Sequence, residues 1–419
     1  MRIMFLTHYF TPEGNAPASR VHEMAKRWVA SGQDVHVITC APNMPDGIVY
    51  EGYSNKFKQT EMVGGIRVTR VWTYIAANKG TLRRILNYVS YMIMASLAGL
   101  FAKRPDIIVA TSPQFFCGWA GVILSKLRRL PFILEIRDIW PESIVAVGAM
   151  HNKRLLSLLE KMEIAMYSAA DHIVTVGEGY RQRLIEKGVP LEKISIVMNG
   201  IDKEVFCPCE PDATLIKKWG LANKFVCSYV GTVGMASGLD TVLHAAKRLK
   251  NMRRSDIHFM IVGDGAIRSD LETKARNMGL DNITFTGRQP KELMPNYLSV
   301  TDSCLVHLRK TKLFETVIPS KIFEAAGMAK PIIIGVAGYA KQSVLEAKAG
   351  IAIESENASE LVAAVVKLAG NPEQKRMLGE AGYRHFGHNN DRANLAHDYQ
   401  TIIELVNSKA KRKPSTVRV

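Results

Sequence analysis

Short apolar runs alternate with helix-like segments along the chain. Residues 2–8 and 34–40 are apolar or β-branched runs typical of buried strands, and in 20–32 apolar residues recur at the spacing of a helix face. The loop 11–19, TPEGNAPAS, contains glycine and two prolines, so we predict no regular structure there. A strand, a helix and a second strand in this order form a βαβ unit, which predicts a parallel sheet.

The same pattern continues in two series that meet near Gly200. Further strands are predicted to begin at Ile66, Asp106, Phe132, His172 and Ile194 in the first series, and at Phe225, Ile257, Ile283, Asp302 and Pro331 in the second. Predicted helices of the second series cover 240–251, 267–278, 290–298 and 319–328. The predicted fold is α/β, with two Rossmann-like doubly wound domains, 1–200 and 201–390, that face a central cleft for ligands. The last helix, about 391–408, packs on the second domain or crosses back to the first, and we favour the crossing.

The run ILNYVSYMIMASLAGLF at 85–101 is nearly uncharged and has basic residues on both flanks. A membrane-spanning helix needs about 20 apolar residues, whereas this run is shorter and contains Asn87, Ser90 and Ser96. We therefore predict a buried helix that packs on the sheet. The alternative is a helix partly exposed at a membrane interface, with its arginines at lipid phosphates.

Composition is that of a well-packed globular protein, with 47% hydrophobic and 22% charged residues among 419. The six cysteines show no repeated spacing, so we expect buried or inert cytosolic thiols and no metal site. The formal net charge of +16 indicates an anionic partner: a phosphorylated substrate, an acidic membrane surface or nucleic acid. Spread basic residues without a nucleic-acid-binding signature argue against nucleic acid. The basic segment 409–418 is expected to be a solvated, disordered tail that also adheres to anionic lipid.

The stretch 314–335 contains the most informative chemistry. Pro319 and Ser320 are suited to open a helix, since proline at the first helical position needs no N–H. Lys321 would then lie in the first turn and Glu324 one turn later. The helix N-terminus offers unpaired N–H groups, the lysine adds a full charge, and the glutamate accepts hydrogen bonds from ribose hydroxyls. This arrangement predicts a nucleotide diphosphate site.

Glycines after two predicted strands also favour phosphate binding. Gly14 lies in the loop after the first strand, just before a helix start. Gly263 and Gly265 follow the strand from Ile257 and resemble half of a dinucleotide fingerprint. The third glycine of that fingerprint is absent, so a nicotinamide site is disfavoured.

Together these features resemble the retaining glycosyltransferases of family 4, whose two-domain fold is called GT-B. The resemblance covers essentially the whole chain and rests on YFTPEGNAPASR at 9–20, EIRDIWPES at 135–143, VGTVGMASGLD at 230–240, IVGDG at 261–265 and PSKIFEAAGMAKPII at 319–333. Within the family it is most similar to bacterial O-antigen N-acetyl-L-fucosamine transferases. The resemblance implies that the second domain binds the sugar donor, that the first binds the acceptor, and that no metal or other cofactor takes part. The absence of any Asp-x-Asp agrees with this.

Carried over by position, Glu324 matches the second glutamate of the family's E-x7-E motif, the ribose ligand. Thr316 stands where the first glutamate belongs and Glu315 precedes it, so either Glu315 enters the sugar pocket or other groups hold the sugar. Thr232 and Ser237 replace the arginine and lysine that neutralise the leaving diphosphate in the family. The donor-binding set that follows is Gly14, Gly231, Thr232, Gly263, Gly265, Arg288, Glu315, Thr316, Pro319, Ser320, Ile322 and Glu324.

A diphosphate that leaves without a metal still needs a cation. We expect Lys321 to supply it, and after it Arg309 or Lys310, for which a solvated loop pair is the alternative reading. Arg288 lies where the family approaches the nucleotide base, largely through backbone groups.

The segment after the strand from Phe132 concentrates charge and an aromatic ring at a ligand-facing strand end. Asp138 is expected to orient the acceptor hydroxyl or accept its proton, Arg137 to bind a phosphate and Trp140 to stack on a sugar. A structural ion pair between Arg137 and Asp138 is the alternative. Glu142 is a secondary acceptor candidate, and His8 is either an acceptor residue or a strand-end hydrogen-bonding residue.

The implied function is a retaining, metal-independent transfer of a sugar, best N-acetyl-L-fucosamine, from UDP to an undecaprenyl-diphosphate-linked saccharide of O-antigen. Such an acceptor gives the positive charge a role. We expect a cytoplasmic protein held peripherally at the anionic inner face of the cytoplasmic membrane, with no nucleic acid partner. The alternatives are a UDP-sugar 2-epimerase of the same fold and a non-catalytic protein that binds a nucleotide sugar, another anionic ligand or nucleic acid.

Overall fold

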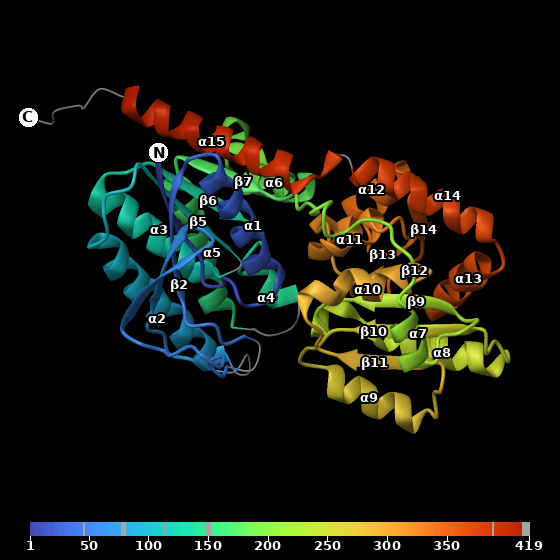
Figure 1. The fold of residues 1–419 in the computed structure, drawn as a ribbon. Helices are drawn as coiled ribbons and strands as arrows, with labels where there is room; N and C mark the ends of the chain where they lie inside the picture. Colours follow the sequence, from blue (N-terminus) through green and yellow to red (C-terminus); the bar gives the residue numbers. More distant parts are fainter. Residues whose placement is uncertain (45–46, 77–80, 113, 147–151, 388, 413–419) are drawn as a thin grey trace, which may run out of the picture. The chain divides into compact units, whose positions relative to one another are not determined.

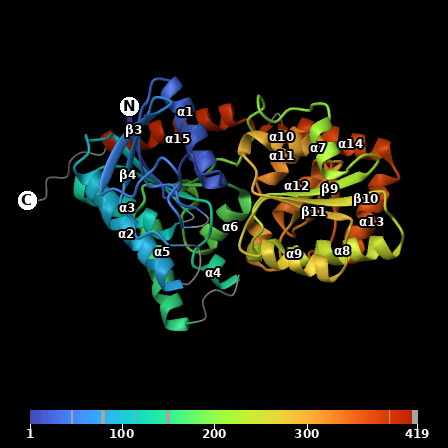
Figure 2. The same ribbon diagram turned by 60° about the horizontal axis from the view of Figure 1, so that its bottom comes forward.

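A computed structural model describes residues 1–419 apart from 45–46, 77–80, 113, 147–151, 388 and 413–419. The chain divides into two units, Met1–Met198 with Arg392–Val419, and Asn199–Asp391. Each unit has one sheet with helices on both faces (Figures 1 and 2). The predicted α/β fold with two Rossmann-like domains is confirmed, and every predicted strand is present.

The first unit contains an eight-stranded sheet in the order β3-β4-β2-β1-β5-β6-β7-β8. Its strands are β1 (Arg2–Leu6), β2 (Asp34–Cys40), β3 (Lys58–Val63), β4 (Ile66–Val71), β5 (Ile107–Thr111), β6 (Phe132–Ile136), β7 (His172–Thr175) and β8 (Ile194–Ile196). All pairs are parallel except β3 with β4. The edge strand β3 was not predicted, because its KQTEMV sequence alternates exposed and half-buried residues and has no apolar run.

Helices pack on both faces of this sheet. They are α1 (Ala16–Ala30), α2 (Thr81–Leu100), α3 (Phe115–Arg128), α4 (Glu142–Ala146), α5 (Lys153–Ala169), α6 (Glu178–Glu186) and α15 (Arg392–Arg412). The prediction that 11–19 lacks regular structure is wrong at its end, since α1 already begins at Ala16. Asn15 caps this helix by accepting a hydrogen bond from the Ala18 N–H at 2.9 Å.

The C-terminal helix α15 packs against α1 (Figure 1). The fully buried Trp28 donates from its indole N–H to the Ala396 carbonyl at 2.8 Å, and its ring meets Tyr399 edge to face at 5.3 Å. Because α15 continues to Arg412, the prediction of a disordered tail is wrong for Lys409, Lys411 and Arg412. Residues 413–419, with Lys413 and Arg418, lie outside the described part of the chain.

Helix α2, predicted to be a buried helix, is buried on one side only. There the Tyr91 hydroxyl lies 2.9 and 2.8 Å from the carbonyl oxygens of Thr7 and Ile38, which share its single proton. The other side exposes Leu86, Ile93 and Leu97, which recur at helical spacing. In the described residues, no helix is both long and apolar enough to cross a membrane.

The second unit contains a six-stranded, fully parallel sheet in the order β11-β10-β9-β12-β13-β14. Its strands are β9 (Phe225–Val230), β10 (Ile257–Val262), β11 (Ile283–Gly287), β12 (Ser303–His307), β13 (Ile332–Gly335) and β14 (Gly350–Ala352). Its helices are α7 (Ala213–Trp219), α8 (Asp240–Asn251), α9 (Arg268–Asn277), α10 (Met294–Ser299), α11 (Lys321–Gly327), α12 (Tyr339–Glu346), α13 (Ala358–Ala369) and α14 (Pro372–Gly382).

Cysteine burial agrees only in part with the prediction. Four thiols are buried, but Cys207 and Cys209, in the segment before α7, are exposed. No group of three or more metal-ligating side chains occurs among the residues that the structure describes. The prediction that no cofactor takes part remains a prediction.

Candidate active site

The Lys321 ammonium group lies at the carboxyl end of β9 in the second unit. Its Nζ atom is 3.5 Å from the centroid of the Tyr229 ring, and a Cβ built on Gly231 would lie 3.2 Å from Nζ. The Tyr229 hydroxyl donates to the Thr232 carbonyl at 2.8 Å, so one side chain supports both the lysine and the loop after β9. Lys321 forms no salt bridge with any described residue, which leaves its charge for a ligand.

Glycines bring the ends of three strands together next to this lysine. Gly231 and Gly263 have φ angles of 139° and 140°, in the region that favours glycine, and the Gly263 N–H donates to the Gly287 carbonyl at 3.1 Å. A Cβ on Gly263 would collide with the Gly231 carbonyl, and one on Gly265 with the Val233 carbonyl. At the ends of β9, β10 and β11, backbone groups therefore lie next to one another without side chains between them. A phosphate group is able to approach the backbone closely at such a place.

The helix start predicted at Pro319 is wrong by two residues. Helix α11 begins at Lys321, and the N–H groups of Ile322 and Phe323 are used by the carbonyls of Pro319 and Ser320 at 3.1 and 3.0 Å. With seven residues and these N–H groups engaged, α11 offers little of the predicted helix-end attraction. The positive charge of the site therefore comes from the lysine side chain. The predicted ligand contact through Ile322 is also corrected, because this side chain is fully buried in the core.

The acidic candidates lie on α11 and on the preceding turn. Glu324 is half-buried on α11, one turn beyond the lysine. Glu315 is exposed in a single 3-10 turn, Leu313–Thr316, while the Thr316 hydroxyl donates to the Leu313 carbonyl at 2.7 Å. The Thr316 hydroxyl proton is already engaged, and whether Glu315 or Thr316 contacts the sugar remains a prediction.

One of the two positions that lack the family's cations, Ser237, is held by a histidine. His307 accepts a hydrogen bond at Nε2 from the Glu356 N–H at 2.9 Å, so its Nδ1 carries the proton and donates to the Ser237 carbonyl at 2.8 Å. Burial lowers the pKa of His307, which keeps the ring neutral. Sequence reasoning missed His307 because a lone histidine in a buried strand shows no pattern. Thr232 is exposed and Ser237 buried, and neither carries charge.

The other cationic candidates differ in their surroundings. Arg309 is exposed, and its backbone N–H donates to the Ala236 carbonyl at 2.9 Å, beside the loop after β9. Lys310 is also exposed and pairs with Glu354 at 2.6 Å. The structure agrees with the solvated alternative for Lys310, and its catalytic role remains a prediction. Arg288 is exposed immediately after β11.

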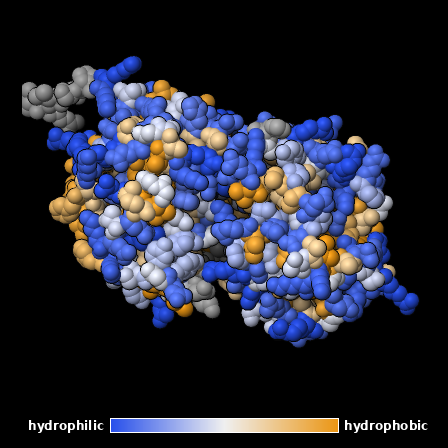
Figure 3. Space-filling view, in the orientation of Figure 1, coloured by the Kyte–Doolittle hydropathy of each residue, from blue (hydrophilic) through white to orange (hydrophobic). Residues whose placement is uncertain are grey.

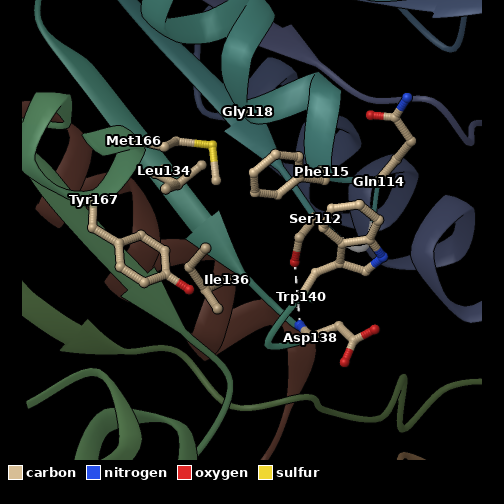
Figure 4. A pocket seen from close by; sticks show the side chains of 10 residues that line it. All are labelled: Ser112, Gln114, Phe115, Gly118, Leu134, Ile136, Asp138, Trp140, Met166 and Tyr167. Carbon is tan, nitrogen blue, oxygen red and sulfur yellow. Dashed lines mark hydrogen bonds between the residues drawn. The ribbon is translucent and has the colours of Figure 1, made fainter. Parts of the chain in front are cut away.

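In the first unit, Arg137 and Asp138 follow β6 at its carboxyl end. The Ser112 hydroxyl oxygen accepts from both of their backbone N–H groups, at 2.6 and 3.2 Å. Asp138 borders a small pocket lined by Phe115, Leu134 and other apolar side chains, with its carboxylate at the pocket's edge (Figure 4). Burial raises the pKa of Asp138 to about 6, a value suited to a proton acceptor at neutral pH.

The alternative of a structural ion pair between Arg137 and Asp138 is wrong, since no such pair forms. The Nε and Nη1 atoms of Arg137 are buried without any hydrogen-bond partner in the described part of the chain. Burial lowers the pKa of Arg137 to about 10, so the side chain keeps its charge at neutral pH.

Two predicted acceptor contacts are corrected. Trp140 is only 8% exposed and stacks on Phe115 with ring centroids 4.5 Å apart, so it offers no open face to a sugar (Figure 4). Glu142 pairs with Arg183 at 2.9 Å and Lys187 at 2.7 Å. Although burial opposes its charge, these cations hold the pKa of Glu142 below its usual value, as in a structural ion-pair cluster.

A second small pocket opens at the ends of β1 and β2. His8 lines it, is 3% exposed and is surrounded by the rings of three tyrosines. Burial lowers the pKa of His8 to about 4, although the side chain of Asn87 favours the charged ring, so His8 is neutral at physiological pH. Both ring nitrogens of His8 are buried without a hydrogen-bond partner among the described residues, so the alternative of a strand-end hydrogen-bonding residue is not supported. A contact of His8 with the acceptor remains a prediction.

A buried glutamate in the loop after β1 escaped sequence reasoning. Glu13 is 4% exposed and accepts from the N–H groups of Asn43 and Met44 at 2.9 and 3.1 Å. Burial raises the pKa of Glu13 to about 7 against these hydrogen bonds. Its neighbour Gly14 is exposed, and a Cβ there would meet nothing, so packing does not require glycine at this position.

Comparison with known proteins matches both units to glycosyltransferases. A model of the Glycosyl transferase 4-like domain matches residues 15–200, and one of the Glycosyl transferases group 1 matches 212–385. The glycosyl transferase WcaI of Escherichia coli (strain K12), whose name refers to colanic acid biosynthesis, is 28% identical over 87% of this chain and 91% of the relative.

Solved structures of similar fold cover nearly the whole chain. Sucrose-phosphate synthase of Thermosynechococcus elongatus has a TM-score of 0.75 at 16% identity, covering 97% of this chain and 99% of that one. Anabaena HepE, in complex with UDP and glucose, has a TM-score of 0.73 at 16% identity, covering 96% and 99%.

Proposed function

We propose that this chain, which belongs to the glycosyltransferases of the GT-B fold, transfers a sugar from UDP to a lipid-diphosphate-linked saccharide. The reaction retains the anomeric configuration and uses no metal. The sugar that we favour is N-acetyl-L-fucosamine, and the acceptor is an undecaprenyl-diphosphate saccharide of bacterial O-antigen. The name of WcaI supports a role in surface polysaccharide synthesis, and the HepE complex supports a UDP donor.

One observation supports the donor assignment most directly: the unpaired Lys321 ammonium against the bare backbone at Gly231. When UDP leaves, negative charge develops on its diphosphate, and a fixed cation close to that charge stabilises the transition state more than the ground state. Gly231 and Gly263 let the diphosphate approach the backbone closely. Glu324 is proposed to hold the ribose, and the departing phosphate itself takes the proton of the acceptor hydroxyl.

The acceptor is assigned to the first unit. Asp138 is proposed to orient the attacking hydroxyl from the end of β6, where ligands bind in open α/β sheets.

A peripheral membrane position is also part of the proposal. Helix α2 exposes an apolar row, and in Figure 3 apolar side chains gather at the edge of the first unit where α2 and α3 lie. Exposed Lys103 and Arg104 follow the helix, and Lys411 lies near them through its 3.7 Å contact with Asp106. Apolar side chains with lysines and arginines beside them suit the surface of an anionic bilayer.

The test is incubation of the protein with a panel of UDP-sugars and polyprenyl-diphosphate saccharides, followed by mass spectrometry of the lipid product. We expect one added N-acetylhexosamine-class residue, formed equally well in EDTA. Free epimerised UDP-sugar in the absence of acceptor would instead identify an epimerase. If the protein binds random DNA at physiological salt and UDP does not displace the DNA, the non-catalytic alternative would be supported.

A further inference from the structure

Arg137 carries a positive charge that has no partner in the described part of the first unit. Its side chain is half-buried, its Nε and Nη1 atoms are buried and unbonded, and its guanidinium makes no salt bridge with any residue in the described ranges. Charges buried in proteins are almost always paired, because removing water from an ion is far more unfavourable than removing it from a neutral group. Two buried guanidinium nitrogens in this state therefore indicate a partner that is not part of the described chain.

The neighbours of Arg137 do not replace that partner. Four groups act on its charge: Glu135 at the end of β6, Arg20 of α1, Tyr180 of α6 and Arg392 of α15. Glu135 is the acid among these four, and it is already engaged. One of its oxygens accepts from Arg20 Nε at 3.0 Å and the other from a threonine hydroxyl of β5. The charge of Glu135 is therefore balanced by Arg20 and does not balance that of Arg137.

We propose that Arg137 is the centre of a phosphate-class oxyanion site in the first unit, and that its ligand is the diphosphate that joins the acceptor saccharide to its lipid. A guanidinium presents N–H donors in a plane that matches two phosphate oxygens. The identification of the ligand as the acceptor diphosphate rests on the proposed function, whereas the oxyanion site itself does not.

The surroundings of Arg137 and Asp138 agree with different roles for the two residues. They are consecutive in the bend that follows β6. Charged groups on α1 and α15 act on Arg137, while Asp138 borders the pocket beside α3 and α5. At least one sugar separates the reacting hydroxyl of a saccharide acceptor from its diphosphate. Two adjacent residues with different surroundings are therefore able to bind these two groups separately.

The first experiment measures oxyanion binding by calorimetry on the full chain, with inorganic pyrophosphate as the probe. It uses Lys321→Met as the background, so that the donor site is weakened and contributes equally to the two proteins compared. We expect pyrophosphate to bind the Lys321→Met protein and to bind the Lys321→Met/Arg137→Met protein at least about tenfold more weakly, because charge-assisted hydrogen bonds are lost. Equal binding by the two proteins, or no binding by the first, overturns the site.

Thermal melting in anion-free buffer separates this role from a structural one. Methionine keeps the unbranched apolar part of the Arg137 side chain but removes its unpaired charge, so Arg137→Met should melt at the same temperature or about 2–4 °C higher. The matched control Arg20→Met breaks the ion pair with buried Glu135 and should melt lower. If Arg137→Met melts as low as Arg20→Met, Arg137 is structural and the proposal fails.

Kinetics distinguish the acceptor diphosphate from free pyrophosphate as the natural ligand. The same saccharide is offered on a polyprenyl diphosphate and on an uncharged alkyl group. Arg137→Met should raise KM about 10- to 100-fold for the diphosphate acceptor only, with kcat little changed. Equal effects on both acceptors overturn the acceptor assignment. Failure of wild-type protein to bind any UDP-sugar would reject the proposed function, yet would leave pyrophosphate binding at Arg137 intact.

Discussion

Replacement of Lys321 by methionine tests the proposed leaving-group role. The substitution removes one positive charge and keeps most of the side-chain volume on α11. At a separation of about 4 Å and an effective dielectric constant of about 20, a unit charge interacts with the diphosphate by about 4 kcal/mol. Part of this attraction is already present when UDP-sugar binds, so only the part that grows with the departing charge changes kcat.

We therefore expect kcat to fall about 10²- to 10³-fold, equivalent to about 3–4 kcal/mol, while UDP affinity falls about tenfold or less. Loss of the contact between Lys321 and the Tyr229 ring should lower the free energy of unfolding by only about 0.5–1 kcal/mol, because the lysine is half-buried. The protein should thus remain folded while turnover is lost.

The assay follows UDP release in single turnovers at saturating acceptor, and calorimetry measures UDP binding separately. Lys310→Met is the matched control, because this lysine is exposed and paired with Glu354, and its turnover should stay within about twofold of wild type. A Lys321→Met protein that keeps its kcat, or loses donor affinity alone, would show that another group stabilises the leaving diphosphate.

Three further predictions concern other sites. Gly263→Ala should abolish UDP binding in calorimetry, because the added Cβ collides with the Gly231 carbonyl. The control Gly234→Ala should bind UDP normally, since the nearest neighbour of its Cβ would be 3.7 Å away. Equal UDP binding by the two variants would reject a diphosphate site at these glycines. The wild-type rate should fall as pH drops through about 6, where Asp138 becomes protonated. Asp138→Asn should be slow and should not show this fall in rate. A fall near pH 6 that persists in Asp138→Asn would belong to another group. Burial lowers the pKa of His258 to about 4, so the unfolded chain takes up a proton below about pH 6.5 and the folded chain does not. The free energy of unfolding should therefore fall by up to about 3 kcal/mol between pH 6.5 and 4, and an unchanged slope in His258→Gln would reject this source.

The strands of both sheets were predictable because parallel strands are buried on both faces and appear as continuous apolar runs. Strand β3 lies at an edge and alternates polar residues, so it does not produce such a run. The start of α1 was missed because glycine and proline suggested a loop, although Asn15 caps the helix and proline is tolerated in a first turn.

The candidate site was predictable only where charge follows a predicted strand or a predicted helix start. Asp138 and Lys321 stand at such positions. The sequence could not show that Lys310 and Glu142 have carboxylate or cationic partners, because those partners are distant along the chain. It equally could not show that Arg137 lacks a partner, or that His307 holds the loop after β9, since both depend on tertiary contacts.

The polypeptide leaves the first unit after Met198 and returns to it at Arg392, where α15 supplies Tyr399 and Ile403 to the core around Trp28. A fragment that stops at Met198 would thus leave a bare apolar surface on α1 and should aggregate when expressed alone. Two separately folding halves of the enzyme therefore require a different division of the chain. Residues 392–412 must be joined to the N-terminal piece through a short linker. The middle segment, 199–391, is then a single insertion that can be exchanged between relatives.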